Sequence, residues 1–147
     1  DGDPALMCQL YQTSLGEDCT PIHDALRVCR ILYERGYKLS IITNGRSTTQ
    51  HSRLSHSELT TMISDLFISE ELGCQKPKKE FFDVVFSKLQ IPASKALVIG
   101  DSLTSDIIGG IQYGIDTCWF NPKEAVNTML QKPTYEIKQL NELLSIL

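Results

Sequence analysis

LVIGDSLTSD, residues Leu97–Asp106, joins an apolar run to two carboxylates. The apolar start predicts a buried strand that ends at Gly100, where the chain turns. Asp101 therefore stands at the carboxyl end of a strand, which is where open parallel sheets bind ligands and metals. Asp106 falls in the first turn of the next predicted helix, where the helix dipole favours negative charge. The alternative is that both aspartates only cap that helix, since aspartate is common at N-caps.

Short apolar runs alternate with amphipathic segments along the rest of the chain. Strands are predicted over residues 39–43, 65–69, 96–99 and 117–120. Helices are predicted over residues 4–16, 20–36, 47–58 and 77–89, after residue 101 as far as 114, and at the end, where Leu140, Leu143, Leu144 and Leu147 repeat at helical spacing. Helices between short apolar strands predict an α/β fold, a three-layer doubly wound parallel sheet covered on both faces.

Composition limits the classes of partner. The chain has 147 residues and a net charge of -4, without a basic block, so a nucleic acid polymer is not indicated. Its apolar stretches are too short to span a bilayer, so a membrane is not indicated either. The five cysteines form no CxxC pair and leave an odd count, which favours free thiols in a reducing compartment. We therefore expect a cytoplasmic protein.

Four features occur in an order that resembles the haloacid dehalogenase-like (HAD) hydrolase superfamily. Thr43-Asn44-Gly45 ends a strand, Lys76 precedes a proline at a helix start, and Gly100-Asp101 ends another strand before Asp106. These positions resemble the second, third and fourth motifs of that family, over nearly the whole chain from about residue 20. The segments TNG (43–45), KPK (76–78) and DTCWFNP (116–122) are most similar to the branch that contains pyrimidine 5'-nucleotidases.

The resemblance implies phosphate-binding and catalytic roles for two segments. The Thr43 hydroxyl would donate to a phosphoryl oxygen, helped by the backbone amides of Asn44 and Gly45, while Lys76 would bring positive charge to the phosphate. Fixed donors and cations suit this chemistry because the phosphoryl oxygens carry the developing charge. Taken singly, each residue has an ordinary explanation, as a strand end, a turn and a solvated lysine.

The resemblance also implies a metal site. Asp101 would bind Mg²⁺, a hard cation that prefers oxygen ligands and keeps several waters. Asp106 would support the metal site by orienting a metal-bound water or Lys76. The dehalogenases of the superfamily work without metal and generally have a neutral residue at the position of Asp101, so this aspartate favours a metal-dependent phosphatase.

The family's first motif, an apolar strand ending in Asp-x-Asp that supplies the nucleophile, is not found in these residues. Asp1-Gly2-Asp3 lacks a preceding apolar strand and runs into a helix. We interpret residues 1–18 as a linker and the last helix of the family's cap domain, and residues 19–147 as a HAD-like, Rossmann-like core without its central first strand and most of its cap. The strands ending at Thr43 and Asp101 would then have unpaired edges, through which a second chain could associate.

The expected function is that of a Mg²⁺-dependent phosphohydrolase acting on small phosphate monoesters, with nucleoside monophosphates as first candidates. The reaction would pass through an aspartyl-phosphate whose nucleophile lies outside this chain, so the chain alone is expected to be inactive. The alternative is a non-catalytic scaffold or interaction module that has lost the nucleophile. The cap normally selects the substrate in this superfamily, so substrate identity is not predicted.

Overall fold

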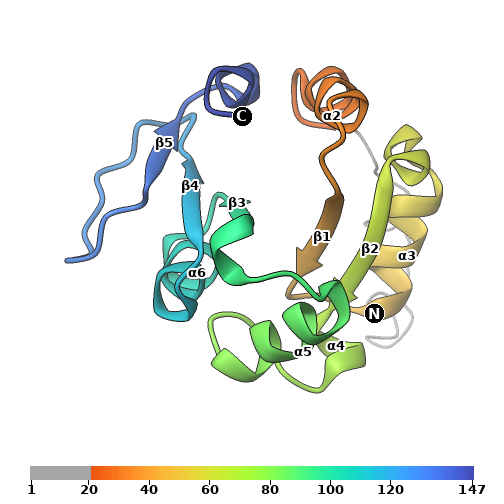
Figure 1. Cartoon of the computed structure of the whole chain (residues 1–147), viewed down its shortest axis with the longest axis horizontal. Helices are drawn as coiled ribbons and strands as arrows, with labels where there is room; N and C mark the ends of the chain where they lie inside the picture. Colours follow the sequence, from red (N-terminus) through yellow and green to blue (C-terminus); the bar gives the residue numbers. More distant parts are fainter. Residues whose placement is uncertain (1–20) are drawn as a thin grey trace, which may run out of the picture. The chain divides into compact units, whose positions relative to one another are not determined.

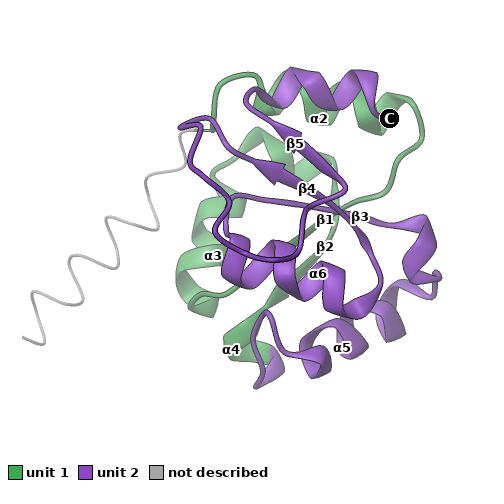
Figure 2. Ribbon diagram, turned by 90° about the vertical axis from the view of Figure 1, so that its left-hand side faces the viewer, with its two compact units in different colours: residues 1–71 green, residues 72–147 purple. Residues whose placement is uncertain are grey.

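The computed structural model describes residues 21–147, which form an α/β fold of parallel strands and helices (Figure 1). Two compact units divide the chain, residues 1–71 and residues 72–147 (Figure 2). The predicted cap helix and linker, residues 1–18, lie outside the described residues. In the described part, no helix has the length and hydrophobicity needed to cross a bilayer.

The first unit is built around a pair of parallel strands. Its described elements are α2 (Ala25–Glu34), β1 (Leu39–Thr43), α3 (Ser47–Ser55), the 3-10 helix η1 (Glu58–Thr61), β2 (Ile63–Ile68) and the start of α4 (Ser69–Leu72). Strands β1 and β2 pair in register, so that Thr43 lies opposite Ile68 at their carboxyl ends. The residues that follow the two strands therefore leave the sheet next to each other.

Three boundaries in this unit differ from the sequence prediction. Helix α2 begins at Ala25 and not near residue 20, because Asp24 has a left-handed backbone (φ 65°) that a helix interior does not accept. Helix α3 ends at Ser55, and residues 58–61 form a separate 3-10 turn. Strand β2 runs over Ile63–Ile68 and not over 65–69, since Ser69 already begins α4.

The second unit contains a three-stranded parallel sheet in the order β3-β4-β5. Its elements are α5 (Lys79–Leu89), the 3-10 helix η2 (Ala93–Lys95), β3 (Leu97–Gly100), the π-helical turn η3 (Leu103–Ile107), α6 (Ile108–Tyr113), β4 (Asp116–Phe120), β5 (Tyr135–Ile137) and the 3-10 helix η4 (Leu140–Ser145). Gly100 pairs with Trp119, so the turn after β3 begins beside a residue of β4.

The C-terminal segment, predicted as a helix from leucines at α-helical spacing, forms the 3-10 helix η4 and not an α-helix. Gln139 and Glu142 form a reciprocal capping box at its start, and Leu143 is buried. The short strand β5 was not predicted.

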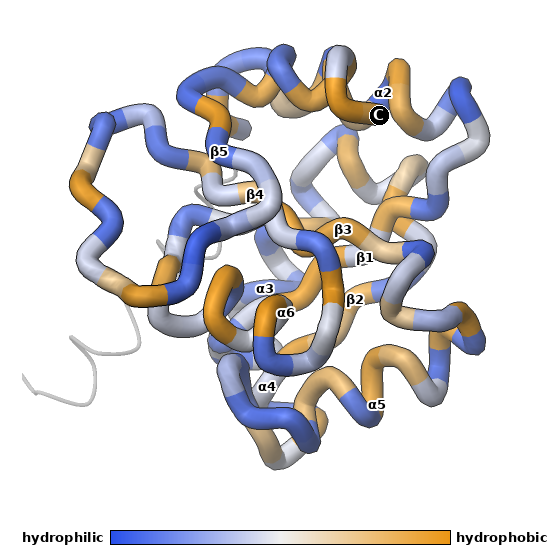
Figure 3. The backbone as a smooth tube through the Cα atoms, turned by 60° about the vertical axis from the view of Figure 1, so that its left-hand side comes forward, coloured by the Kyte–Doolittle hydropathy of each residue, from blue (hydrophilic) through white to orange (hydrophobic). Residues whose placement is uncertain are grey.

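The core of the second unit depends on close packing at two glycines. A Cβ atom at Gly109 would lie 2.7 Å from the Phe82 ring, and one at Gly110 would lie 2.6 Å from Cγ2 of Thr117. Helix α6 therefore packs close to α5 and β4 because both positions lack a side chain. Hydrophobic residues make up β3 and parts of α5 (Figure 3).

Among the described residues, β1 and β3 belong to separate sheets and each pairs with one strand only. On β3, Ile99 remains 39% exposed, which is high for a β-branched residue in a parallel sheet.

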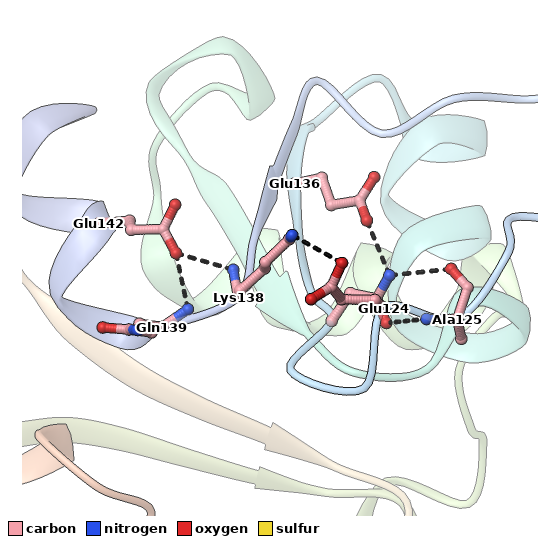
Figure 4. A network of polar contacts seen from close by, with 7 residues as sticks. Glu124, Ala125, Glu136, Lys138, Gln139 and Glu142 are labelled. Atoms are coloured by element: carbon pink, nitrogen blue, oxygen red, sulfur yellow. Dashed lines mark hydrogen bonds and ion pairs between the residues drawn. The ribbon is translucent and has the colours of Figure 1, made fainter.

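The long connection between β4 and β5 is closed at its base by one buried side chain. Asn121 donates to Ala125 O (2.9 Å) and to Oε1 of Glu136 (2.7 Å), and it accepts from Ala125 N–H (2.9 Å) (Figure 4). Lys138 and Glu124 add an exposed ion pair at 2.8 Å. Side-chain contacts thus hold the base of this connection, which contains no helix or strand.

Candidate active site

A buried ion pair joins two of the predicted site residues. Lys76 Nζ donates to Oδ1 of Asp106 at 2.6 Å, and the two side chains are only 7% and 10% exposed. Lys76 lies before α5 and Asp106 lies in η3, so elements 30 positions apart in sequence form the pair. A charge in such a place needs a partner, because burial of an unpaired charge costs several kcal/mol.

The turn after β3 holds the Asp106 carboxylate by its second oxygen. Ser102 N–H donates to Oδ2 of Asp106 at 3.3 Å, and the Ser102 hydroxyl accepts from Ser105 N–H at 3.2 Å. Ser102 therefore caps the first turn of η3 as well as contacting the aspartate. Asp106 is engaged on both oxygens, and its contact with Lys76 corresponds to one of the two orienting roles predicted for it.

Asp101 differs from Asp106 in its surroundings. Its residue is exposed, and among the described residues its carboxylate has no hydrogen-bond partner. Its backbone carbonyl accepts from Nε1 of Trp119 at 3.0 Å. Trp119 is buried, at 3% exposed. Its bond to Asp101 was missed, although it follows from the pairing of Gly100 with Trp119.

The side chains at this turn can supply part of a Mg²⁺ site. Among residues 21–147, no three His, Cys, Asp or Glu side chains gather in a way that could hold a metal ion by themselves. Mg²⁺ commonly binds one or two carboxylates and fills its other positions with water and substrate phosphate. The exposed Asp101 carboxylate fits such a site as one ligand. Asp106 stays a predicted supporting residue.

The predicted phosphate-binding residues Thr43, Asn44 and Gly45 lie at the carboxyl end of β1, in the first unit. Thr43 is the last residue of the strand, half-buried, and Asn44 is exposed. Gly45 N–H donates to the Ser69 hydroxyl at 3.1 Å. Ser69 was not predicted as part of this loop, because only the register of β1 and β2 brings it there.

Two acidic residues of α4 contact the start of α3. Ser47 N–H donates to Oε2 of Glu70 at 2.7 Å, and Oε1 of Glu71 lies 2.7 Å from Nε2 of His51. The Ser47 hydroxyl also donates to Oε1 of Glu71. The hydrogen bond from Ser47, with a smaller contribution from the one to His51, lowers the pKa of Glu71. His51 is exposed, and its contact with Glu71 was not predicted from the sequence.

Comparison with known proteins identifies similar chains. Residues 3–120 match the family model described as haloacid dehalogenase-like hydrolase. The chain is 45% identical to the HAD-hydrolase YfnB of Bacillus subtilis (strain 168) over 148 residues, covering 100% of this chain and 63% of that protein. It is 38% identical to the pyrimidine 5'-nucleotidase PynA of Streptococcus pneumoniae (strain ATCC BAA-255 / R6), covering 99% of this chain and 62% of PynA.

A solved structure shows the same fold. The crystal structure of YfnB from Bacillus subtilis bound to magnesium superposes with a TM-score of 0.93 at 44% sequence identity. The match covers 99% of this chain and 64% of that one. The chain thus spans less than two thirds of the length of these relatives.

Proposed function

This chain belongs to the haloacid dehalogenase-like hydrolase family, and we propose that it forms part of a Mg²⁺-dependent phosphatase for small phosphate monoesters. Nucleoside monophosphates are the first substrates to test, because PynA, 38% identical over nearly the whole chain, is a pyrimidine 5'-nucleotidase. In its crystal structure, YfnB is bound to magnesium, which supports the choice of metal for this chain.

The observation that carries the proposal is the buried Lys76–Asp106 ion pair. A lysine that served only as a solvated surface charge would not be buried to 7% exposure and held by a carboxylate at 2.6 Å. Held in this way, its ammonium group has a fixed position. Such a preorganised cation stabilises the negative charge on phosphoryl oxygens at no cost of reorganisation.

In the proposed reaction, each residue of this chain has a separate task. The Thr43 hydroxyl donates to a phosphoryl oxygen, and Lys76 contributes positive charge while Asp106 keeps it in position. Asp101 would hold Mg²⁺, and the bound ion would supply positive charge to neutralise the phosphate. An aspartate outside these 147 residues attacks phosphorus and expels the alcohol, and water then hydrolyses the aspartyl-phosphate to regenerate the carboxylate.

The test is hydrolysis of p-nitrophenyl phosphate and of nucleoside monophosphates by the native protein that contains this chain. We expect turnover that depends on Mg²⁺ and falls about 100-fold or more in Lys76→Ala and Asp101→Ala, as for the loss of one strong electrostatic contact. Lys95→Ala is the matched control, since Lys95 is exposed. The 147-residue chain by itself is expected to show no turnover.

Two outcomes would contradict the proposal. Turnover by Lys76→Ala equal to that of the Lys95→Ala control would remove Lys76 from the reaction. Release of halide from a 2-haloacid without Mg²⁺, with no phosphate ester cleaved, would place the protein among the dehalogenases.

A further inference from the structure

Helix α3 does not cap its own N-terminus. Arg46, the residue before the helix, is extended and makes no side-chain capping bond. The exposed N–H group of Ser47 is satisfied by Glu70 at 2.7 Å, a residue of a different helix. The backbone groups at a helix start need such partners, so α4 stabilises the first turn of α3.

The same short segment of α4 also holds the turn that precedes α3. Ser69 accepts from Gly45 N–H at 3.1 Å, and Glu71 accepts from the Ser47 hydroxyl. We call Ser69, Glu70 and Glu71 the 69–71 clasp. Three consecutive residues thus bind a segment 23 or 24 positions earlier in the chain.

The clasp and the sheet fix the two ends of one loop. On one side, Thr43 is paired opposite Ile68 in the register of β1 and β2. On the other side, the clasp holds Gly45 and Ser47. Asn44 therefore lies between two constrained points, Thr43 at the end of β1 and Gly45 on Ser69.

We propose that the 69–71 clasp is the positioning element of the phosphate-binding loop, with Ser69 as its principal positioning residue. This inference rests on the proposed function and deepens it. Because its N–H donates to the Ser69 hydroxyl, Gly45 contributes to the shape of the loop and not to phosphate binding. The loop's contacts with the phosphoryl group then come from Thr43 and Asn44.

Loss of the Ser69 hydroxyl should weaken phosphate binding more than it slows the chemical step. The Ser69–Gly45 bond shapes the loop equally in the bound substrate and in the transition state, so its loss should raise KM and leave kcat nearly unchanged. For Ser69→Ala we expect about a fivefold rise in KM for p-nitrophenyl phosphate and in the Kd for inorganic phosphate, the usual effect of one neutral hydrogen bond. Ser69→Thr retains the hydroxyl and should restore both values.

The measurements are steady-state kinetics and calorimetric titration of inorganic phosphate into the native protein. Ser64→Ala is the matched control, because Ser64 is an exposed serine of the neighbouring strand β2. A purely structural Ser69 would lower the unfolding midpoint of the Ser69→Ala protein and leave KM and Kd unchanged. That result would overturn the inference.

The titration separates this inference from the proposed function. Wild-type protein that binds inorganic phosphate but cleaves no phosphate ester would contradict the proposed function. The Kd of Ser69→Ala would still decide the role of the clasp. Wild-type protein that does not bind phosphate at all would overturn both.

Discussion

The Asp106 carboxylate occupies the space in which a side chain at position 100 would lie. A Cβ atom on Gly100 would overlap the carboxylate and would stand 2.5 Å from Cγ and 2.6 Å from Cβ of Asp106. Because Gly100 lacks that atom, Asp106 can approach the end of β3 and still reach Lys76 at 2.6 Å. A glycine at the strand end is thus part of the geometry of the ion pair.

Gly100→Ala should therefore displace Asp106 and destabilise the protein. Overpacking of a closely packed site typically costs about 1–3 kcal/mol in free energy of unfolding. Urea denaturation measures this loss. Combining Gly100→Ala with Asp106→Ala removes the overlap, so the double variant should be more stable than the sum of the two single effects. Additive effects would mean that the two residues do not compete for the same space.

Removing one partner of the Lys76–Asp106 pair should cost more than removing both. Lys76→Met leaves the Asp106 carboxylate buried without its cation, which typically costs about 3–5 kcal/mol in free energy of unfolding. The double variant Lys76→Met/Asp106→Leu leaves no charge and should lose less than the single variant. Lys79→Met is the control, because the Lys79–Asp83 pair is exposed and should contribute little. An equal loss in free energy of unfolding from Lys76→Met and Lys79→Met would contradict the prediction that the buried pair matters more than the exposed one.

The indole of Trp119 should influence Mg²⁺ binding through the Asp101 backbone. Trp119→Phe keeps an aromatic ring in the core but removes the donor that holds Asp101 O at 3.0 Å. If Asp101 is a metal ligand, its freer backbone should weaken Mg²⁺ binding by about three- to tenfold, the range for one hydrogen bond. Calorimetric titration of Mg²⁺ measures this directly.

Tyr135→Phe provides the control for Trp119→Phe, since it also removes a polar group from an aromatic ring, at an exposed position. Both variants should fold, and only Trp119→Phe should change the affinity for Mg²⁺. Unchanged affinity together with lower stability would show that the indole bond serves the fold alone.

Cys118 should resist alkylation in the folded protein. Burial, with a smaller contribution from the negative charge of Glu142, raises the pKa of its thiol to about 11. A raised pKa keeps the thiol protonated, so at pH 8 only about one molecule in a thousand carries the reactive thiolate. Peptide mass spectrometry after iodoacetamide treatment should show slow labelling of Cys118 and faster labelling of the half-buried Cys74. Equal rates before unfolding in urea would contradict the prediction.

Local sequence patterns were enough to predict most of the strands and to predict that candidate site residues follow two of them. The apolar runs before Asn44 and Asp101 form β1 and β3 within one or two residues of the predicted bounds. Apart from Ile99, these runs are buried or half-buried in parallel sheets, so their composition reflects their environment. The short strand β5 was not predicted because Tyr135–Ile137 contains only three residues, with a glutamate in the middle.

The supporting contacts of the site could not be predicted in this way. Ser69 reaches Gly45, and Trp119 reaches Asp101, only because two strands pair in a particular register. A register is a relation between distant segments, and no local pattern in either segment specifies it. The C-terminal leucines show the converse, since their spacing is helical but the segment forms a 3-10 helix.

The hydrogen bonds of Asn121 make the base of the β4–β5 connection more sensitive to substitution than its tip. Beyond its base, the connection carries Val126 and Leu130, which are 82% and 98% exposed. Because Asn121 fixes the base through Ala125 and Glu136, we expect the sheet to tolerate changes at the tip. The tip is therefore a natural place for an inserted tag, a fluorescent label or evolutionary drift in loop length.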